Sequence, residues 1–256
     1  MPLNRQKFMN TYIDNVTKNQ AIDHIEYCIQ HRIIGQVITP NVDQIVRMEW
    51  DEYFRKICQE CELLLVDGHP LLWTARLYKQ PFKEKICGSD LVPELCDMAA
   101  KKGYSVFLLG AAPGVAMKAA NNLLKVNPKL KVAGVYSPPL GFEKDEKEIE
   151  NINKILYESK ADMLFVGMGV PKQDIFIYEN MHKYQIPMSF SIGGTIDFIA
   201  GEQKRAPKWI RKIGFEWLYR LLKDPKRMFK RYIIDDRKFL RLIWKYRPEA
   251  KLVEDR

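Results

Sequence analysis

The sequence predicts an α/β protein: a Rossmann-like, mainly parallel sheet with helices on both faces, followed by a basic amphipathic helical appendage. Two observations predict the body: short β-rich runs alternate with helical patterns over the first 200 residues, and no internal repeat interrupts them. A third predicts the appendage: the basic excess lies in the last fifth of the chain. Since 256 residues, 46% of them hydrophobic, suffice for one large core plus an appendage, we expect a body over residues 1–201 and an appendage over residues 202–256.

Six strands and six helices are expected in the body. The strands are Gln36–Thr39, Leu63–Val66, Ser105–Leu109, Lys131–Tyr136, Met163–Val166 and Met188–Ile192. The helices are Thr17–His31, Asp43–Glu60, Ser89–Lys102, Pro113–Val126, Lys144–Ser159 and Lys172–Lys183. Ser89 is expected to be an N-cap, and Gly103 suits the position just after its helix.

Polar residues and glycines follow each predicted strand at its carboxyl end. The six segments are Thr39–Asn41, Asp67–Pro70, Gly110–Gly114, Tyr136–Pro139, Gly167–Gln173 and Gly193–Asp197. In a parallel sheet these ends share one edge, and ligands bind beyond it. We therefore expect the functional site at that edge.

Two of these segments carry glycines that let a ligand approach the backbone. Gly110-Ala-Ala-Pro-Gly114 lies between a strand and a helix, where the helix N-terminus favours a phosphate group. It lacks the G-x-G-x-x-G spacing, and the next strand ends at Tyr136 and Ser137 instead of at an acidic, ribose-binding residue. This argues against a nicotinamide-dependent enzyme and leaves a nucleotide or nucleotide-sugar site open. Gly167-Met-Gly169 is a second such loop, which a plain tight turn explains equally well.

Asp67 is the carboxylate that we expect to take part in chemistry. It follows the apolar run Leu63–Val66 directly, and Gly68 and Pro70 define the turn around it. A carboxylate at the edge of a partly apolar site can have a raised pKa and act as a general base. A helix-capping Asp is the alternative interpretation. His69 could share the role, although a lone His is more often structural.

The sequence indicates neither a metal nor a cofactor. It contains no D-x-D pair, so a metal-chelated diphosphate is not indicated. Cys58-Gln-Glu-Cys61 has the spacing of zinc ligands, but no second C-x-x-C or nearby His-x-x-x-His completes such a site. With Cys28, Cys87 and Cys96 the cysteines are odd in number, and ordinary reduced cytosolic cysteines are the favoured interpretation.

The appendage should bind an anionic partner. From Glu202 to Arg256 there are 18 Lys and Arg against 8 Asp and Glu, a net charge of +10. The whole chain has 41 against 32, which leaves residues 1–201 with 23 against 24 and a net charge of −1. Nucleic acid, a lipid surface and phosphate groups all fit a basic segment of this kind.

Apolar residues in the appendage follow a helical stripe of Ile210, Ile213, Trp217 and Leu221, and Asp224-Pro225 should end that helix. Basic helices with Trp and Leu on the other face are typical of membrane surfaces. Packing of these aromatic residues on the body explains the pattern equally well. No apolar run approaches ~18 residues, and the N-terminus lacks an apolar signal core, so neither a spanning helix nor export is expected.

A series of motifs occurs in a fixed order between Met9 and Tyr232. They are Thr39-Pro40-Asn41, Asp67-Gly68, Phe107-Leu-Leu-Gly110-x-x-Pro-Gly114, Gly167-x-Gly169-x-Pro-Lys-Gln173, Gly193-Gly194, Arg205-Ala-Pro207-x-Trp209, Glu216-Trp-Leu-Tyr-Arg220 and Pro225-x-Arg227. In this combination the sequence resembles the WecG/TagA/CpsF glycosyltransferase family. The two motifs that begin at Arg205 and Glu216 are its most specific part.

The resemblance implies an inverting, metal-independent glycosyltransferase without a cofactor. Such enzymes move an N-acetylhexosamine or a related sugar from a UDP-sugar to a polyprenyl-diphosphate-linked acceptor, for teichoic acid, common antigen or capsule. In the family pattern Asp67 is the base, Thr39 and Asn41 line the acceptor or sugar site, and Gln173 contacts the sugar. The appendage closes over the site and touches an anionic membrane, which implies a cytoplasmic enzyme, peripheral on the inner face of the cell membrane.

Arginines of the appendage are implied to hold the departing diphosphate. Arg220 and Arg227 match by motif, whereas Lys230-Arg231 leaves open which residue is the third partner. The residues expected to bind substrate are Thr39, Asn41, Gly110, Gly114, Tyr136, Gly169, Gln173, Arg205, Arg220, Arg227 and Arg231.

The main alternative is a nucleotide-fold binding protein whose basic tail binds nucleic acid, in keeping with a pI near 9.2. The core-like spacing of the Trp and Leu residues in the tail and the absence of a nucleic-acid-binding motif argue against it, so no nucleic acid partner is expected.

Overall fold

A six-stranded parallel sheet forms the centre of the molecule. The computed structural model describes residues 4–207, 210, 216–223 and 237–254. The strand order is β4-β3-β8-β7-β5-β6, and every neighbouring pair is parallel. The strands are β3 (Gly35–Ile38), β4 (Leu63–Leu64), β5 (Ser105–Gly110), β6 (Lys131–Tyr136), β7 (Met163–Gly167) and β8 (Met188–Ser191). All six predicted strands are confirmed, with small differences at their ends.

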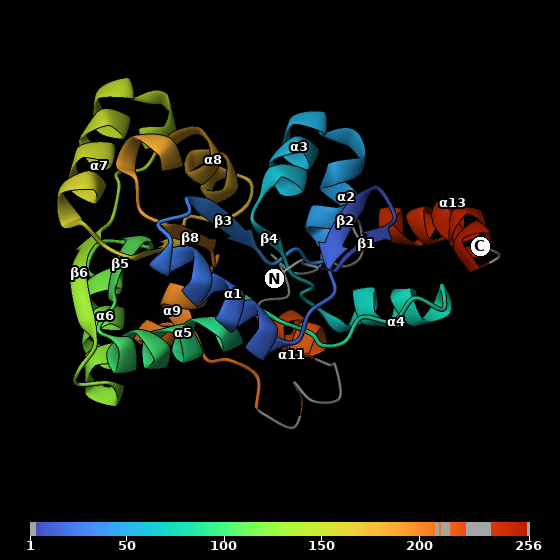
Figure 1. The fold of residues 1–256 in the computed structure, drawn as a ribbon, viewed down its shortest axis with the longest axis horizontal. Helices are drawn as coiled ribbons and strands as arrows, with labels where there is room; N and C mark the ends of the chain where they lie inside the picture. Colours follow the sequence, from blue (N-terminus) through green and yellow to red (C-terminus); the bar gives the residue numbers. More distant parts are fainter. Residues whose placement is uncertain (1–3, 208–209, 211–215, 224–236, 255–256) are drawn as a thin grey trace.

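Helices cover both faces of this sheet, as the sequence predicts (Figure 1). One face carries α2 (Val42–Trp50), α3 (Glu52–Glu60), α7 (Glu146–Ser159) and α8 (Lys172–Tyr184), and the other carries α1 (Lys18–Gln30), α5 (Gly88–Lys102), α6 (Val115–Val126) and α9 (Thr195–Ala200).

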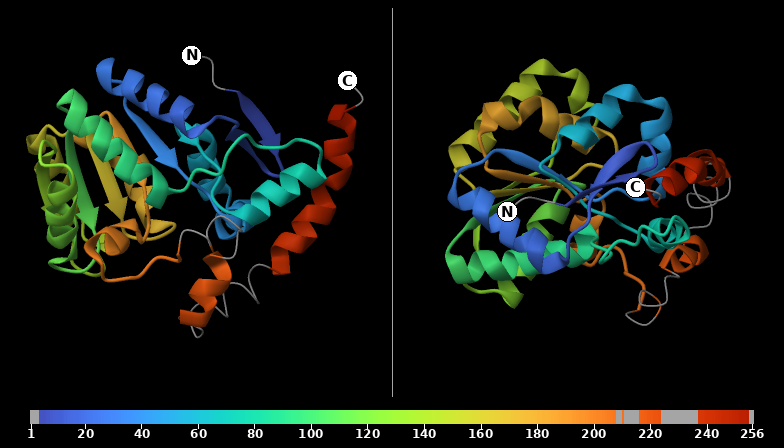
Figure 2. Two further views of the ribbon diagram at one scale, coloured as in Figure 1. Left: turned by 90° about the horizontal axis from the view of Figure 1, so that it is seen from below. Right: turned by 45° about the vertical axis from the view of Figure 1, so that its right-hand side comes forward.

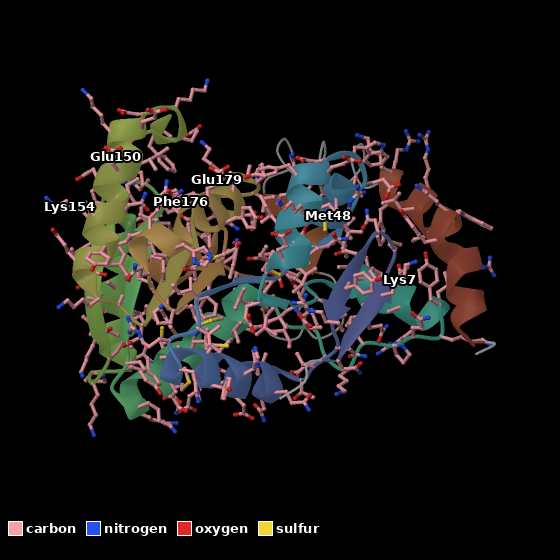
Figure 3. All side chains as sticks on the ribbon, turned by 45° about the horizontal axis from the view of Figure 1, so that its top comes forward. Lys7, Met48, Glu150, Lys154, Phe176 and Glu179 are labelled. Atoms are coloured by element: carbon pink, nitrogen blue, oxygen red, sulfur yellow. The ribbon has the colours of Figure 1, made fainter. Side chains whose placement is uncertain are left out.

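Alternate side chains of the strands supply a core to each face. Val106 and Leu108 of β5 join the cluster under α1, α5 and α6, whereas Phe107 and Leu109 join the cluster under α7 and α8. Polar residues face outward: Figure 3 shows Glu150 and Lys154 projecting from the outer side of α7. The body is therefore a three-layer α/β structure.

The helix predicted over Asp43–Glu60 is wrong as a single helix. Asp51, in extended conformation, ends α2, and its Oδ1 accepts a hydrogen bond of 2.9 Å from the backbone N–H of Phe54 in α3. The short carboxylate stabilises a new helix start because it satisfies a backbone N–H that otherwise has no partner. The predicted N-cap Ser89 is also wrong, since α5 already begins at Gly88, whereas Gly103 is confirmed as a left-handed helix end with φ of 80°.

An N-terminal hairpin, β1 (Arg5–Phe8) and β2 (Thr11–Asp14), was not expected from the sequence. Its turn lacks the Gly and Asn-Gly signals that mark hairpins. Asp14 accepts hydrogen bonds from Leu64 N–H at 2.8 Å and from Arg5 Nε at 3.0 Å, and so fixes the edge strand β4. Helices α4 (His69–Leu77) and α9 and the short 3-10 helix η1 (Phe142–Lys144) are not among the six predicted helices.

The described part of the appendage begins with a non-helical segment over residues 202–207 and contains two helices, α11 (Glu216–Lys223) and α13 (Arg237–Glu254), in keeping with the predicted helical character. Helix α13 packs against α2 and the end of α4 (Figures 1 and 2). Its Phe239 and Leu242 are buried in the same cluster as the hairpin, and Tyr246 donates a hydrogen bond of 2.9 Å to Glu49 of α2. Of the predicted stripe, Ile213 lies outside the described residues, as does the predicted helix end at Asp224-Pro225.

None of the described helices combines the length and the apolar character needed to cross a bilayer.

A buried polar group lies between the sheet and α8. Gln36 of β3 donates hydrogen bonds of 3.2 Å to the backbone oxygen of Asp174 and to Ser191 Oγ. The Asp174 side chain is fully buried, and among the described residues neither carboxyl oxygen has a hydrogen bond of ordinary geometry, although the Ser191 hydroxyl is near. Burial therefore raises the pKa of Asp174 to about 7.

This carboxyl should make stability depend on pH. Between its ordinary pKa near 3.8 and about 7, the unfolded chain loses the Asp174 proton while the folded chain keeps it, so stability falls as the pH rises. At about 1.4 kcal/mol per pKa unit, the folded state is destabilised by about 4 kcal/mol at pH 8. Asp174→Asn should remove most of this loss between pH 5 and pH 8, measured by urea denaturation.

Glu179→Gln, which removes an exposed carboxylate from the same helix (Figure 3), is the control and should leave the wild-type slope unchanged. Parallel pH profiles for wild type and Asp174→Asn would show that the buried carboxyl does not titrate in this range.

Candidate active site

The carboxyl ends of the six strands meet at one edge of the sheet, here called the carboxyl edge. The register shows this directly: Ile38 pairs with Leu64 and Ser191, and Gly110 pairs with Gly167. The loops after the strands are therefore neighbours along this edge. The expectation that the polar and glycine-containing segments after the strands share this edge is confirmed.

The loops after β5 and β7 make the closest backbone approach. A Cβ atom on Gly110, whose φ is 110°, would lie 2.5 Å from the backbone oxygen of Gly167. One on Gly167 would lie 2.8 Å from the backbone oxygen of Gly193, and Ala111 N–H donates to Gly167 O at 3.0 Å. From β5 the chain turns outward to β6, and from β7 it turns inward to β8. This is a topological switch point, where open α/β sheets bind ligands.

Gln173, at the start of α8, joins two of these loops. Its side-chain oxygen accepts hydrogen bonds from Gly169 N–H at 3.2 Å and from Gly193 N–H at 3.0 Å, and the residue is 2% exposed. Its amide NH₂ group donates no hydrogen bond to the described residues. The family resemblance predicts a sugar contact for Gln173. Its role in fixing the loop geometry is visible only in the structure. Because only the side-chain oxygen binds the loops, the NH₂ group remains able to donate to a sugar.

Thr39 and Asn41 follow β3 and lie next to Asp67. Asn41 is the N-cap of α2: its Oδ1 accepts from Asp43 N–H at 3.0 Å, and Gln44 Oε1 accepts from Asn41 N–H at 3.2 Å. Between them, Pro40 O accepts a hydrogen bond of 2.9 Å from Asp67 N–H. The cap and this backbone bond position both loops.

Asp67 does not cap the helix that follows it. The N-cap of α4 is Gly68, with φ of 107°, and no side chain satisfies that helix start. Asp67 is half-buried at the carboxyl edge, and its charge contributes, after burial, to raising the pKa of the Cys87 thiol to about 12. The helix-capping interpretation is thus excluded, and the carboxylate lies close to the start of α5.

Arg205 links the appendage to this part of the body. Its Nη1 donates to Asp90 Oδ1 at 2.5 Å and to Ser89 O at 3.2 Å, and its Nη2 donates to Cys87 Sγ at 3.3 Å. Cys87 Sγ also donates to Asp90 Oδ2 at 2.9 Å. Burial alone would raise the pKa of Asp90, but the hydrogen bonds from Arg205 and Cys87 outweigh it and lower the pKa to about 2.

Helix α11 reaches the same cluster through Glu216, whose Oε1 lies 3.7 Å from Arg205 Nε. Burial and the charge of Lys85 lower the pKa of His69, while Glu216 acts in the opposite direction. A neutral His69 beside Asp67 is favoured by this environment. The ion pairs of Arg205 show that the appendage is held at the carboxyl edge.

The remaining expected residues are placed differently. Tyr136 ends β6, the far edge strand, where its hydroxyl donates to Glu148 at 2.7 Å. Five strand spacings of about 4.8 Å put it roughly 24 Å from Asp67 along the edge. Gly114, with φ of 83°, precedes α6, and the space that a Cβ atom would occupy there is empty of other atoms within 4 Å. The side chain of Arg220 in α11 lies outside the described structure, as do Arg227 and Arg231.

The cluster of Lys85, Cys87, Asp90 and Glu216 was not predicted from the sequence. The only signal for it is Gly88-Ser89-Asp90, a helix start in which Asp90 lies in the first turn. No pattern in the sequence shows that Arg205, more than a hundred positions away, returns to it.

Within the described ranges, the cysteines and the candidate metal-binding groups can be placed directly. All five cysteines are free and buried, and Cys61 Sγ donates to Cys58 O at 3.0 Å. Within the described ranges, the grouping of residues suited to a metal ion is His24, Cys28 and Glu62, which does not include the C-x-x-C pair.

A parallel α/β sheet, glycine loops at its switch point and a carboxylate at the same edge are features of the nucleotide-binding α/β fold class. The model of the glycosyl transferase WecG/TagA/CpsF family matches residues 6–252, and the chain belongs to this family. It is a glycosyltransferase, as the resemblance implied.

Three relatives carry the same name, N-acetylglucosaminyldiphosphoundecaprenol N-acetyl-beta-D-mannosaminyltransferase. The protein of Bacillus subtilis strain 168 is 31% identical over 214 residues, 83% of this chain and 81% of its own. That of Bacillus spizizenii is 29% identical over 227 residues, 88% and 84% of the two chains. That of Staphylococcus aureus strain MW2 is 28% identical over 217 residues, 84% and 83% of the two chains.

The Arg205–Asp90 pair should contribute measurably to stability. Hydrogen bonds to charged groups contribute about 1.5–3 kcal/mol, so Arg205→Ala should lower the free energy of unfolding by about 2 kcal/mol. A double-mutant cycle with Asp90→Asn should give a coupling of about 1 kcal/mol or more, measured by urea denaturation.

The control pair is Lys118 and Glu202, an exposed ion pair at 2.8 Å. Its coupling should stay below about 0.5 kcal/mol. Equal coupling energies for the two pairs would mean that Arg205 does not anchor the appendage.

Proposed function

We propose that this protein is an inverting, metal-independent transferase that moves N-acetylmannosamine or a related sugar from a UDP-sugar to a polyprenyl-diphosphate-linked GlcNAc acceptor. The observation that carries the proposal is the position of Asp67 at the carboxyl edge, where it caps no helix and its N–H is hydrogen-bonded to Pro40 in the loop after β3. The names of the relatives supply the sugar and the acceptor. The product would enter teichoic acid or a related cell-surface polysaccharide.

The glycine loops suit the nucleotide end of the donor. Gly110 and Gly167 bring backbone close to backbone, and Gly114 leaves the N-terminus of α6 open toward an anionic group. Gln173 holds Gly169 and Gly193 in place and can offer its NH₂ group to a sugar hydroxyl. A UDP-sugar lying along the edge would then point its sugar toward Thr39, Asn41 and Asp67.

The reaction would be a single displacement. Asp67 accepts the proton of the acceptor hydroxyl, the hydroxyl oxygen attacks the anomeric carbon, and the bond from that carbon to the β-phosphate oxygen breaks. UDP leaves with the bonding electrons, and the anomeric configuration inverts. Positive side chains then stabilise the charge on the diphosphate.

Arginines are suited to that last role because their fork binds phosphate oxygens in pairs. Arg205 is already engaged with Asp90, Ser89 and Cys87. We therefore assign the leaving diphosphate to Arg220, Arg227 and Arg231, and give Arg205 the role of holding the appendage close.

Helix α13 would place the enzyme on an anionic membrane, at its cytoplasmic face. Leu240 is 62% exposed and Trp244 70% exposed on this helix, and Trp50 of α2 is 61% exposed. Lys238 lies 5.4 Å above the Trp50 ring and Arg247 lies 5.5 Å from the Trp244 ring. Exposed aromatic and basic side chains in alternation are typical of helices that lie in the headgroup region.

The activity is tested by UDP release from a panel of UDP-sugars, with a short-chain lipid-diphosphate-GlcNAc acceptor and EDTA present. Release that depends on the acceptor and on one sugar is expected. Release that requires added divalent cations would overturn the metal-independent mechanism, and absence of UDP binding would overturn the donor assignment.

Asp67→Asn should lower turnover by about 10²-fold or more, because the amide cannot take the proton, while UDP binding stays close to that of wild type. Initial rates and calorimetric UDP binding measure the two effects. Near-normal turnover in this variant would remove Asp67 from the role of base.

The membrane role predicts that Leu240→Ala combined with Trp244→Ala weakens vesicle binding by at least about tenfold, since each buried side chain contributes about 1.5–3 kcal/mol. Co-sedimentation with phosphatidylglycerol vesicles at low and high salt measures it. Leu140→Ala removes a still more exposed apolar side chain elsewhere and is the control. Binding that is insensitive to lipid charge, salt and the double substitution would contradict the proposal.

A further inference from the structure

Three side chains with metal-binding atoms meet at the amino ends of the strands, on the side of the sheet opposite to the carboxyl edge that carries Asp67. His24 and Cys28 lie one turn apart on α1, and Glu62 immediately precedes β4. His24 Nε2 is 2.6 Å from Glu62 Oε1, Cys28 Sγ is 3.5 Å from His24 Nε2, and Cys28 Sγ is 3.8 Å from Glu62 Oε1. One nitrogen, one sulfur and one oxygen thus face a common point.

The surrounding structure aims Glu62 at α1. A Cβ atom on Gly35 would lie 2.6 Å from Glu62 Cβ, so the glycine provides the space in which the Glu62 stem lies. The backbone of Glu62 is fixed by a hydrogen bond of 2.9 Å to Gln36 O and by one of 3.2 Å from Arg5.

The cluster is largely shielded from water. Cys28 is fully buried, and the side chains of His24 and Glu62 are 10% and 28% exposed. The partial exposure of Glu62 gives a solvent molecule access to the cluster.

The separations fit a tetrahedral zinc ion. With Zn–N and Zn–O distances of about 2.1 Å and a Zn–S distance of about 2.3 Å, ligand atoms lie about 3.4–3.6 Å apart. The two separations that involve sulfur already match this range to within a few tenths of an ångström. Only the hydrogen-bonded pair of His24 and Glu62 must open, by about 0.8 Å.

We propose that His24 Nε2, Cys28 Sγ and Glu62 Oε1 bind one Zn²⁺ ion, with a water molecule as the fourth ligand. On binding, the Cys28 thiol releases its proton to solvent, and the thiolate and carboxylate together neutralise the dication. The mixed nitrogen, sulfur and oxygen donors suit zinc, whereas Ca²⁺ and Mg²⁺ require oxygen ligands.

The affinity should be lower than that of a closed four-residue site. His24 Nδ1 is buried and has no hydrogen-bond partner among the described residues, so the ring lacks the outer carboxylate or carbonyl that usually orients a zinc-bound histidine. The open fourth position acts in the same direction.

The ion would join α1 to β4, an edge strand of only two residues. Asp67 follows the carboxyl end of this strand, whereas Glu62 precedes its amino end. The proposed zinc site is therefore separate from the reacting groups and does not rest on the proposed function. We expect zinc to raise thermal stability and to leave the chemical step without a metal.

The test uses the full-length protein freed of metal and then titrated with Co²⁺ as a spectroscopic probe. A tetrahedral visible spectrum with a thiolate charge-transfer band, saturating at one ion per chain, is expected. Cys28→Ser should abolish that band and weaken binding at least about tenfold. Cys96→Ser, which changes another fully buried cysteine that belongs to no group of three possible metal ligands among the described residues, is the matched control and should keep both.

Glu62→Gln separates a metal site from a structural hydrogen bond, because the amide still pairs with His24 but binds zinc poorly. Zinc should raise the melting temperature of wild type and of Cys96→Ser, but not that of Glu62→Gln. A Co²⁺ band that persists in Cys28→Ser, no Co²⁺ spectrum in wild type, or an equal zinc effect in Glu62→Gln would overturn the proposal.

Discussion

Ile38 of β3 pairs with Leu64 of β4 on one side and with Ser191 of β8 on the other, and the same parallel pairing continues through β7 and β5 to β6. Because every strand runs in the same direction, each polar segment that follows a strand is delivered to one edge. Asp67, the glycine loops and the cap of α2 come from distant parts of the sequence. The parallel pairing of the strands is sufficient to bring them to the same edge of the sheet.

Within that edge, two interactions set the fine geometry. The backbone contacts of Gly110 and Gly167 leave no space for a side chain, and the Gln173 oxygen joins the loops after β7 and β8. Arg205 then fastens the appendage to Asp90 beside Asp67. These contacts fix the backbone of the loops, and the Arg205 bonds bring a part of the chain with a different composition and charge to the same edge.

The sequence predicts the sheet well because its strands are short apolar runs bounded by glycines and polar residues. It predicts the position of Asp67 for the same reason. It does not predict the break at Asp51, since an acidic residue fits a helix interior as well as a cap, or the hairpin at Met9, which lacks a turn signal.

The roles of Gln173 and Arg205 could not be derived from sequence either, because their partners depend on tertiary packing. Motif resemblance identified both residues as important. Only the structure shows that each holds other parts of the site in position.

A crystal structure with UDP bound is the most direct test of the proposed donor site at the carboxyl edge. We expect the nucleotide along the carboxyl edge, with its diphosphate near the loops after β5 and β7 and its terminal phosphate directed toward Asp67. UDP bound at the amino ends of the strands, or with its diphosphate directed away from Asp67, would contradict the proposed site.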